Sequence, residues 1–216
     1  MKRLFELANR IKDKDLRERT LKLLKNPQTK NPEFSKYRAS DFSKIPAWIG
    51  AHHDYEGGLL DHVLAVTELS IGMAKSLEKI YGKEIKKIVK KGINYDYLIA
   101  GALLHDISKV FLIKKAGKEK QKMGVKWEFS GSMLDHAVFS SNLLFEHGFP
   151  EEVVHIVASH GGDLGSAGAN PKTIEAWIVV QADNLGAMFE STIVHPSMSL
   201  QQLQFLLAPP SESGVK

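Results

Sequence analysis

Apolar residues recur every three or four positions along most of this 216-residue chain, a pattern that is typical of amphipathic helices. A first stripe runs from Leu4 to Leu24, with a break around residues 12–15. A longer stripe runs from Leu59 to Ile80, and Gly57-Gly58 marks its entry. The pattern predicts helices over residues 4–25, 59–80, 83–91, 94–109, 133–147, 150–159, 173–189 and 199–207.

Two segments depart from this simple amphipathic pattern. Residues 110–114 and 125–129 bracket a lysine-rich turn that contains Gly117 and Gly124, which predicts a small β-hairpin near 110–129. From residue 173 to 189 apolar side chains occupy nearly every side, which predicts a buried helix. We therefore expect an all-α helical bundle with one small hairpin.

The length and the 43% share of hydrophobic residues fit a globular protein with an ample core. We expect residues 1–47 to form a helical extension packed on the core. We expect residues 48–207 to form the main domain and residues 208–216 to form a disordered tail. Residues 161–172 are expected to be a glycine-rich surface loop, with a substrate lid as the alternative.

Composition and charge narrow the range of ligands and binding partners that the sequence allows. Cysteine is absent, so any metal must use His, Asp or Glu. No stretch reaches the roughly 20 apolar residues of a membrane span, and no signal peptide is visible, which predicts a cytoplasmic protein without a membrane partner. Much of the net charge of +4 lies in residues 83–91 and 114–126 without interleaved aromatic residues, which favours a solvated face over a nucleic-acid surface. Homo-oligomerisation stays open.

The stretch from Leu98 to Lys109 combines an apolar helix with three polar residues. On one helix His105, Asp106 and Lys109 share a face. An unpaired charge is costly to bury, and a neighbouring imidazole and carboxylate relieve that cost when both coordinate one cation. A structural histidine beside a solvated aspartate is the alternative.

Other polar residues interrupt apolar helices in the same way. Asp183 lies in the predicted buried helix, and no Lys or Arg occurs between Lys172 and Lys216 to neutralise it locally. Mixed histidine and carboxylate ligands suit iron, manganese, zinc, cobalt or nickel better than calcium or magnesium. The residues that we expect to face inward from five helices are His62, His105, Asp106, His136, His160 and Asp183.

The order of these residues resembles the HD-domain family of metal-dependent phosphohydrolases. The resemblance lies in the segments 57–62, 103–109 and 182–184 and covers roughly residues 48–190. It implies an HD-domain helical bundle with one or two divalent transition metals, Fe²⁺ or Mn²⁺ first and Zn²⁺, Co²⁺ or Ni²⁺ as alternatives. The metal ligands that it implies are His62, His105, Asp106 and Asp183, with His136 and His160 as the extra histidines of two-metal members. Gly58 stands where three-metal members place a carboxylate, so we do not expect a third metal.

The run from His52 to His62 is similar to two subgroups of that family. One is the HD domain of bacterial 3'-to-5' exoribonucleases, which carry a nucleic-acid-binding barrel that residues 1–47 are too few to form. The other consists of archaeal phosphodiesterases of methanopterin biosynthesis, which open a 2',3'-cyclic phosphate. The resemblance therefore implies a cyclic-phosphate phosphodiesterase that acts on a small pterin or nucleotide ester. A nucleotide or nucleoside monophosphate phosphohydrolase and a noncatalytic metal- or nucleotide-binding module are the alternatives.

Three residues are expected to act on the phosphate. Asp106 bridges two metals or orients the nucleophile, and Lys109 contacts a phosphate oxygen as a point charge. His53 enters the site through the glycine turn and binds the phosphate. The remaining histidines are expected to be surface or packing residues, namely His52, His147, His155 and His195.

Overall fold

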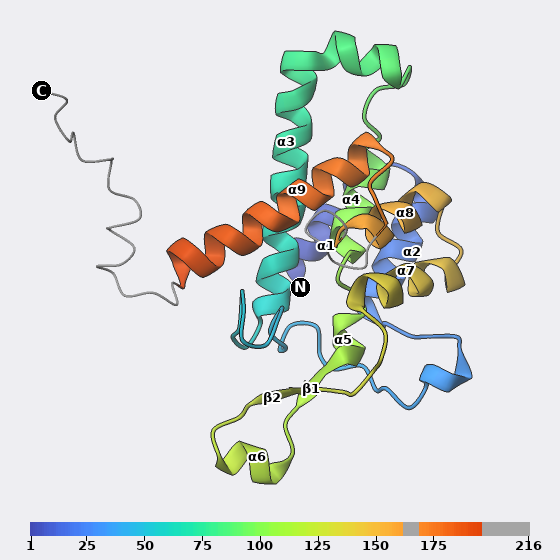
Figure 1. The fold of residues 1–216 in the computed structure, drawn as a ribbon. Coiled ribbons are helices and arrows are strands. Elements are labelled where there is room, and N and C mark those ends of the chain that lie inside the picture. The colour runs from blue at the N-terminus through green and yellow to red at the C-terminus, as the bar shows by residue number, and fades with distance from the viewer. Residues whose placement is uncertain (162–168, 196–216) are drawn as a thin grey trace, which may run out of the picture.

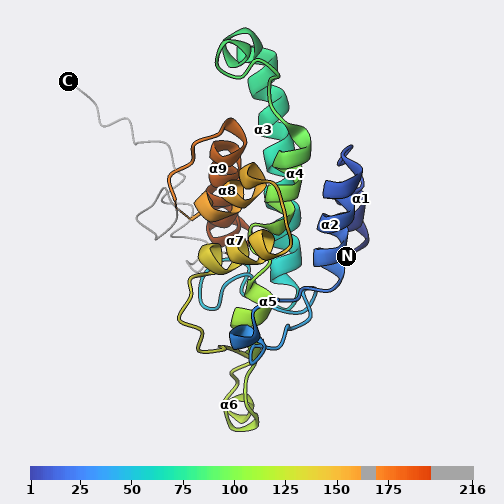
Figure 2. The same cartoon turned by 90° about the vertical axis from the view of Figure 1, so that its right-hand side faces the viewer.

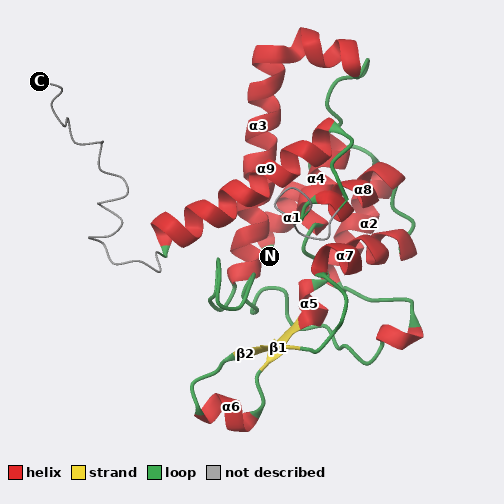
Figure 3. Cartoon of the chain, viewed as in Figure 1, coloured by secondary structure: helices red, strands yellow, loops and turns green. Residues whose placement is uncertain are grey.

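The computed structural model describes residues 1–161 and 169–195, and helices dominate these ranges (Figure 1, Figure 3). The helices are α1 (Lys2–Ala8), α2 (Lys14–Lys25), α3 (Gly58–Ile88), α4 (Tyr95–Leu104), α5 (Lys109–Leu112), α6 (Lys118–Lys122), α7 (His136–Glu146), α8 (Glu151–Ser159) and α9 (Ile174–Phe189). A 3₁₀ turn η1 (Pro32–Phe34), a π-helical turn η2 (Glu190–Val194) and the strands β1 (Ile113–Lys115) and β2 (Trp127–Phe129) complete the described elements. The predicted all-α bundle with a small hairpin is confirmed.

The helices form three layers around a central pair. Figure 2 shows α3 and α4 in the middle, with α1 and α2 on one side and α7, α8 and α9 on the other. Helix α9 crosses α3, and α8 packs on both α4 and α9. One buried cluster joins α1 and α2 to the central pair, and a second joins α9 to it. The two buried clusters therefore meet at the central pair α3 and α4.

Local capping and turn chemistry account for several helix boundaries. Asp13 begins α2, because its side chain accepts a hydrogen bond from the backbone N–H of Leu16. The break that was predicted around residues 12–15 is thus confirmed, although it lies slightly earlier, between Ala8 and Lys14. Asn94 caps α4 as expected, with its side-chain oxygen accepting from the N–H groups of Asp96 and Tyr97.

Two predicted boundaries are wrong in detail. Residues 83–88 are not a separate helix but continue α3 after a kink at Tyr81, whose φ of −118° and ψ of 17° are not helical. The kink lies directly before Gly82, a residue type that weakens the helical ladder. In the hairpin, residues 110–112 belong to α5, so the strands are shorter than expected and pair Ile113 with Phe129.

Helix α9 is not buried on all sides, which corrects the prediction for residues 173–189. One face packs on α3, α4 and α8, whereas Trp177 is 49% exposed and Met188 is 65% exposed. Apolar composition alone does not distinguish a helix buried all round from one whose outer face is also apolar.

Some expectations fall outside what is described. The 162–168 part of the glycine-rich loop, the helix predicted at 199–207 and the tail at 208–216 lie outside the described residues. The division into an extension and a main domain stays a prediction, although α1 and α2 do contact the central helices. Across the described ranges, every helix is too short or too polar to cross a bilayer.

Candidate metal centre

The His105-Asp106 pair lies in a turn and not on a continuous helix, which corrects the prediction of a helix through residue 109. Helix α4 ends at Leu104, and α5 begins at Lys109. The backbone N–H of Ser108 donates to the Ser140 hydroxyl on α7 at 3.1 Å. This tertiary contact takes the place of a hydrogen bond that would continue α4, so packing against α7 ends the helix.

Three side chains converge on one side of this turn. His62 Nε2 on α3 lies 3.1 Å from Asp183 Oδ1 on α9 and 3.1 Å from His105 Nε2. The His105 Nδ1–H donates to the carbonyl oxygen of Ala102 at 2.7 Å, so its Nε2 carries the lone pair that faces the cluster. All ligand atoms of His62, His105 and Asp183 lie within 4.8 Å of one another.

A second group of three lies on the other side of the turn. Asp106 Oδ1 is 3.6 Å from His160 Nε2 and 3.8 Å from His136 Nε2. His160 follows α8 directly, and its Nδ1–H donates to the carbonyl oxygen of Val157 at 2.6 Å. That bond places the proton of the neutral His160 ring on Nδ1, as in His105, and leaves the lone pair on Nε2. The structure thus brings together all six residues that were predicted to bind metal.

The donor set fits a divalent cation. His160 Nε2 and Asp106 Oδ1 are buried and have no hydrogen-bond partner, which is costly for polar atoms unless something else binds them. With metal–ligand bonds of about 2.1 Å, neighbouring ligand atoms are roughly 3.0 to 3.4 Å apart around one ion. His62 Nε2 lies 3.2 Å from Asp106 Oδ2, and His105 Nε2 lies 3.3 Å from it. These spacings match, so the cluster can hold a metal ion.

Electrostatics keep the carboxylates ionised. Burial opposes the charge on Asp106, but Lys109 and His105 outweigh it and hold the pKa of this carboxyl well below its usual range. Burial likewise disfavours a charged His62, yet its hydrogen bonds to Asp106 and Asp183 raise the pKa of the imidazole above its usual value. Burial dominates at His105 and lowers its pKa. A cation would therefore compete with a proton at His62 more than at His105.

Lys109 stands at the edge of the cluster. It is 3% exposed, and its Nζ lies 2.6 Å from Asp106 Oδ2. The same ammonium lies 5.3 Å from the ring centroid of Trp48, in cation–π geometry. Lys109 is therefore close enough to the cluster for its predicted phosphate contact, and it already offsets one negative charge there.

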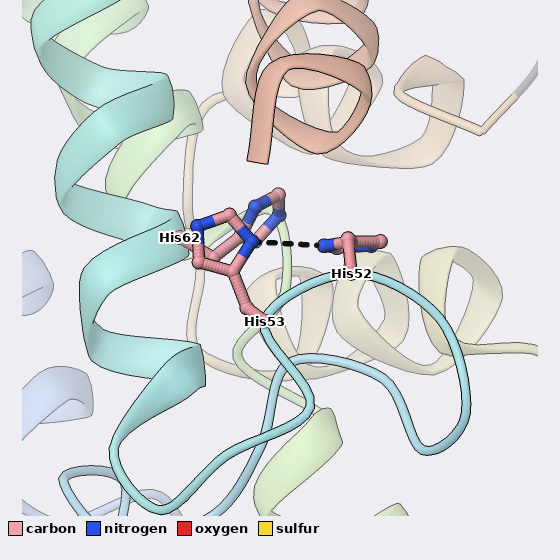
Figure 4. Close-up of side chains that lie close together, drawn as sticks. All are labelled: His52, His53 and His62. Atoms are coloured by element: carbon pink, nitrogen blue, oxygen red, sulfur yellow. Dashed lines mark hydrogen bonds between the residues drawn. The ribbon is translucent and has the colours of Figure 1, made fainter. Parts of the chain in front are cut away.

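A histidine turn closes the cluster on the His62 side. Figure 4 shows His52, His53 and His62 together, with His52 Nδ1 and His53 Nδ1 3.2 Å apart. The ring of His52 lies 4.7 Å from that of His62, so of the two roles predicted for His52, surface or packing, the structure shows packing. Burial, followed by the charge of His62, lowers the pKa of His52 to about 3 and that of His53 to about 4.

Sequence reasoning missed Glu190, which holds this turn. Its carboxylate accepts a 2.7 Å hydrogen bond from the backbone N–H of His53 and lies 2.9 Å from Nδ1 of His195. Glu190 is 5% exposed and directly follows Phe189 at the end of α9. The signal that singled out Asp183, a carboxylate beside an apolar helix, applies equally to Glu190.

Four histidines and two aspartates, from α3, α7, α9 and the turns after α4 and α8, meet in one helical core, which defines a helical domain with a candidate metal-binding site. The comparisons with known proteins agree, because the model of the HD domain family matches residues 59–188. The chain belongs to the HD domain family, and the predicted resemblance is confirmed.

Two curated proteins illustrate the relationship. The chain is 38% identical over 194 residues to the dihydroneopterin 2',3'-cyclic phosphate phosphodiesterase of Methanocaldococcus jannaschii, which covers 90% of this chain and 72% of that protein. It is 32% identical over 155 residues to the 3'-5' exoribonuclease YhaM of Geobacillus sp., covering 68% of this chain and 42% of that protein. No solved structure matches the chain.

Proposed function

We propose that this protein is a metal-dependent phosphodiesterase that opens a 2',3'-cyclic phosphate, with dihydroneopterin 2',3'-cyclic phosphate as its first substrate to test. The observation that carries the proposal is the cluster of six buried or half-buried ligand residues around Asp106. The similarity to the Methanocaldococcus enzyme over 90% of the chain supports the choice of ester.

Each ligand residue has a proposed role near the reacting phosphate. His62, His105, Asp106 and Asp183 would hold one cation, and Asp106, His136 and His160 would hold the second cation of a two-metal site. Fe²⁺ or Mn²⁺ is the first choice, with Zn²⁺, Co²⁺ and Ni²⁺ as alternatives. A bound divalent cation supplies Lewis acidity and a water of lowered pKa.

The chain's own groups orient the ester and balance its charge. The Lys109 ammonium contacts a nonbridging phosphate oxygen near Asp106. His53 donates a hydrogen bond as a neutral imidazole from the opposite side, consistent with its lowered pKa. Hydrolysis adds one water, breaks one of the two ring P–O bonds and leaves a monophosphate ester beside a hydroxyl that has taken up the proton.

The test is hydrolysis of a matched panel by the metal-free protein reloaded anaerobically with Fe²⁺, Mn²⁺, Zn²⁺, Co²⁺ or Mg²⁺. The panel contains dihydroneopterin cyclic phosphate, 2',3'-cyclic nucleotides, linear monophosphates and single-stranded RNA. We expect opening of the cyclic esters and its loss in Asp106→Asn, which keeps the size of the side chain. Turnover of linear monophosphates alone would instead identify a nucleotidase, and ligand binding without turnover would identify a binding module.

Two further predictions about the protein are open to simple measurements. We propose a cytoplasmic location, which cell fractionation tests. Homo-oligomerisation is tested by light scattering of the purified chain at several concentrations, because a stable oligomer shows a multiple of the chain mass throughout and a reversible one loses mass on dilution.

A further inference from the structure

A cavity of about 430 Å³ opens beside the second half of the metal cluster. It lies between Trp48, the end of β2 and the segment that leads into α7. Its lining includes His136, whose Nε2 is 3.8 Å from Asp106 Oδ1. The cavity therefore adjoins the cluster at His136, and its size lies within the range of small-molecule pockets.

Aromatic rings line this cavity. The Trp48 ring lies 5.4 Å from the Phe129 ring and 5.4 Å from the His136 ring, measured between centroids. Phe129 is 49% exposed, so part of its ring is accessible to a ligand. Lys109 Nζ lies over the same Trp48 ring. The wall that Trp48 and Phe129 form therefore begins beside the lysine that is proposed to contact the phosphate.

The cavity also offers a polar contact. Ser130 lines it, and its Oγ is buried without a hydrogen-bond partner. A buried hydroxyl that pairs with nothing in the protein is suited to a donor or acceptor on a ligand. Met133, another lining residue, has a fully exposed thioether, which adapts to the edge of an aromatic ligand.

We propose that this cavity binds the planar heterocycle of the substrate, with one face of the heterocycle against the wall that Trp48 and Phe129 form together and the Ser130 hydroxyl hydrogen-bonded to its edge. The proposal rests on the proposed function, since it requires the phosphate end of the ester at the metal cluster. Flat rings with hydrogen-bonding edges, such as a pterin or a purine, satisfy both the aromatic wall and the unpaired hydroxyl. The cavity then selects the substrate, while the cluster performs the hydrolysis.

The first test measures kcat/KM for two cyclic esters that share the reacting group. One is dihydroneopterin 2',3'-cyclic phosphate, and the other is glycerol 1,2-cyclic phosphate, which has no ring system. In Phe129→Leu the kcat/KM for the dihydroneopterin ester, divided by that for the glycerol ester, should fall about tenfold, which is within the range of a single lost ring contact. Ser130→Ala should lower the same ratio several-fold. Trp177→Leu, an equally exposed aromatic on α9, is the matched control and should leave the ratio unchanged.

The second test needs no turnover and uses neopterin, which lacks the phosphate, with the metal-free protein. Stacking on Trp48 should quench tryptophan fluorescence, and Trp48→Phe should remove that quenching while Trp177→Phe retains it. An unchanged kcat/KM ratio in Phe129→Leu, or quenching that persists in Trp48→Phe, would overturn the proposal. If no ester is hydrolysed, the proposed function fails, and the quenching result still decides whether the cavity binds the ring.

Discussion

Gly58 offers a sharp test of how the histidine turn is held against α3. A methyl group built on Gly58 would lie 1.9 Å from the carbonyl oxygen of His53 and 2.9 Å from its carbonyl carbon. These are backbone atoms, so no side-chain rotation relieves the clash. Gly58→Ala should therefore displace the His53 backbone, and any larger side chain at this position, a carboxylate included, meets the same obstacle.

The size of the effect follows from the contacts that the displacement breaks. Ordinary contact requires the His53 oxygen to move by about 1.5 Å, and this oxygen accepts a 3.1 Å hydrogen bond from the Ala47 N–H. The His53 N–H, which donates to Glu190, moves with it. Overpacking costs about 1 to 3 kcal/mol, and each lost hydrogen bond adds about 1 kcal/mol. We expect a loss of roughly 3 to 5 kcal/mol if both hydrogen bonds break, equivalent to a fall in Tm of roughly 6 to 20 °C.

The assay is thermal and urea unfolding of the metal-free protein, with a control on the same helix. Gly72 is exposed in α3, and a methyl group there meets nothing within 4 Å. Gly72→Ala should therefore stabilise the protein by about 0.5 to 1 kcal/mol, because alanine favours the helix interior. The two substitutions should have opposite signs. Equal or greater stability of Gly58→Ala relative to the wild type would refute the steric argument.

Three further predictions test the packing, the charges and the metal. Gly101→Ala should lower the free energy of unfolding by about 1 to 3 kcal/mol, because the new methyl group would lie 2.4 Å from Ile156 Cγ2. The double variant Gly101→Ala, Ile156→Ala should lose less stability than the sum of the two single losses, because the smaller side chain removes the clash. Burial raises the pKa of Asp183, but His62 outweighs it and the net shift is downward. The Asp183 carboxylate therefore stabilises the metal-free protein above about pH 4, and this contribution is lost as the pH falls further. Asp183→Asn should weaken the acid dependence in unfolding titrations between about pH 2 and 5. Finally, chelation should lower the Tm, and added Mn²⁺ should restore it. When the free ion is at 100 times its Kd, its binding should add about 2.7 kcal/mol to the free energy of unfolding. A Tm that neither treatment changes would contradict the metal site.

The positions of most helices could be predicted because their signals are local. Gly57-Gly58 at the start of α3, the Asn94 cap of α4 and the periodicity of α8 are all read within a few residues, and the structure confirms each. The end of α4 could not be predicted in this way. Apolar periodicity continues past Leu104, but the contact between Ser108 and Ser140, 32 positions apart, ends the helix.

The members of the site could be predicted for a different reason. A histidine or carboxylate within an apolar pattern must find a partner when the helix packs, whatever its exact orientation. That reasoning found Asp183 and also applies to Glu190, which was overlooked because no ligand motif surrounds it. It could not choose between a surface and a packing role for His52, because the position of His52 depends on how the turn before α3 folds back against His62 and not on any helical pattern.

The geometry of the centre depends on Asp106 in a way that residue types alone do not reveal. One oxygen, Oδ2, faces His62 and His105 at 3.2 and 3.3 Å, whereas Oδ1 faces His160 at 3.6 Å. Because Asp106 lies in the turn after α4, a single carboxylate reaches ligands on α3 and at the end of α8. The turn is tied to α7 through Ser108, so the packing of four helices determines where this carboxylate lies. A substitution that shifts any one of these helices should therefore disturb both halves of the cluster together.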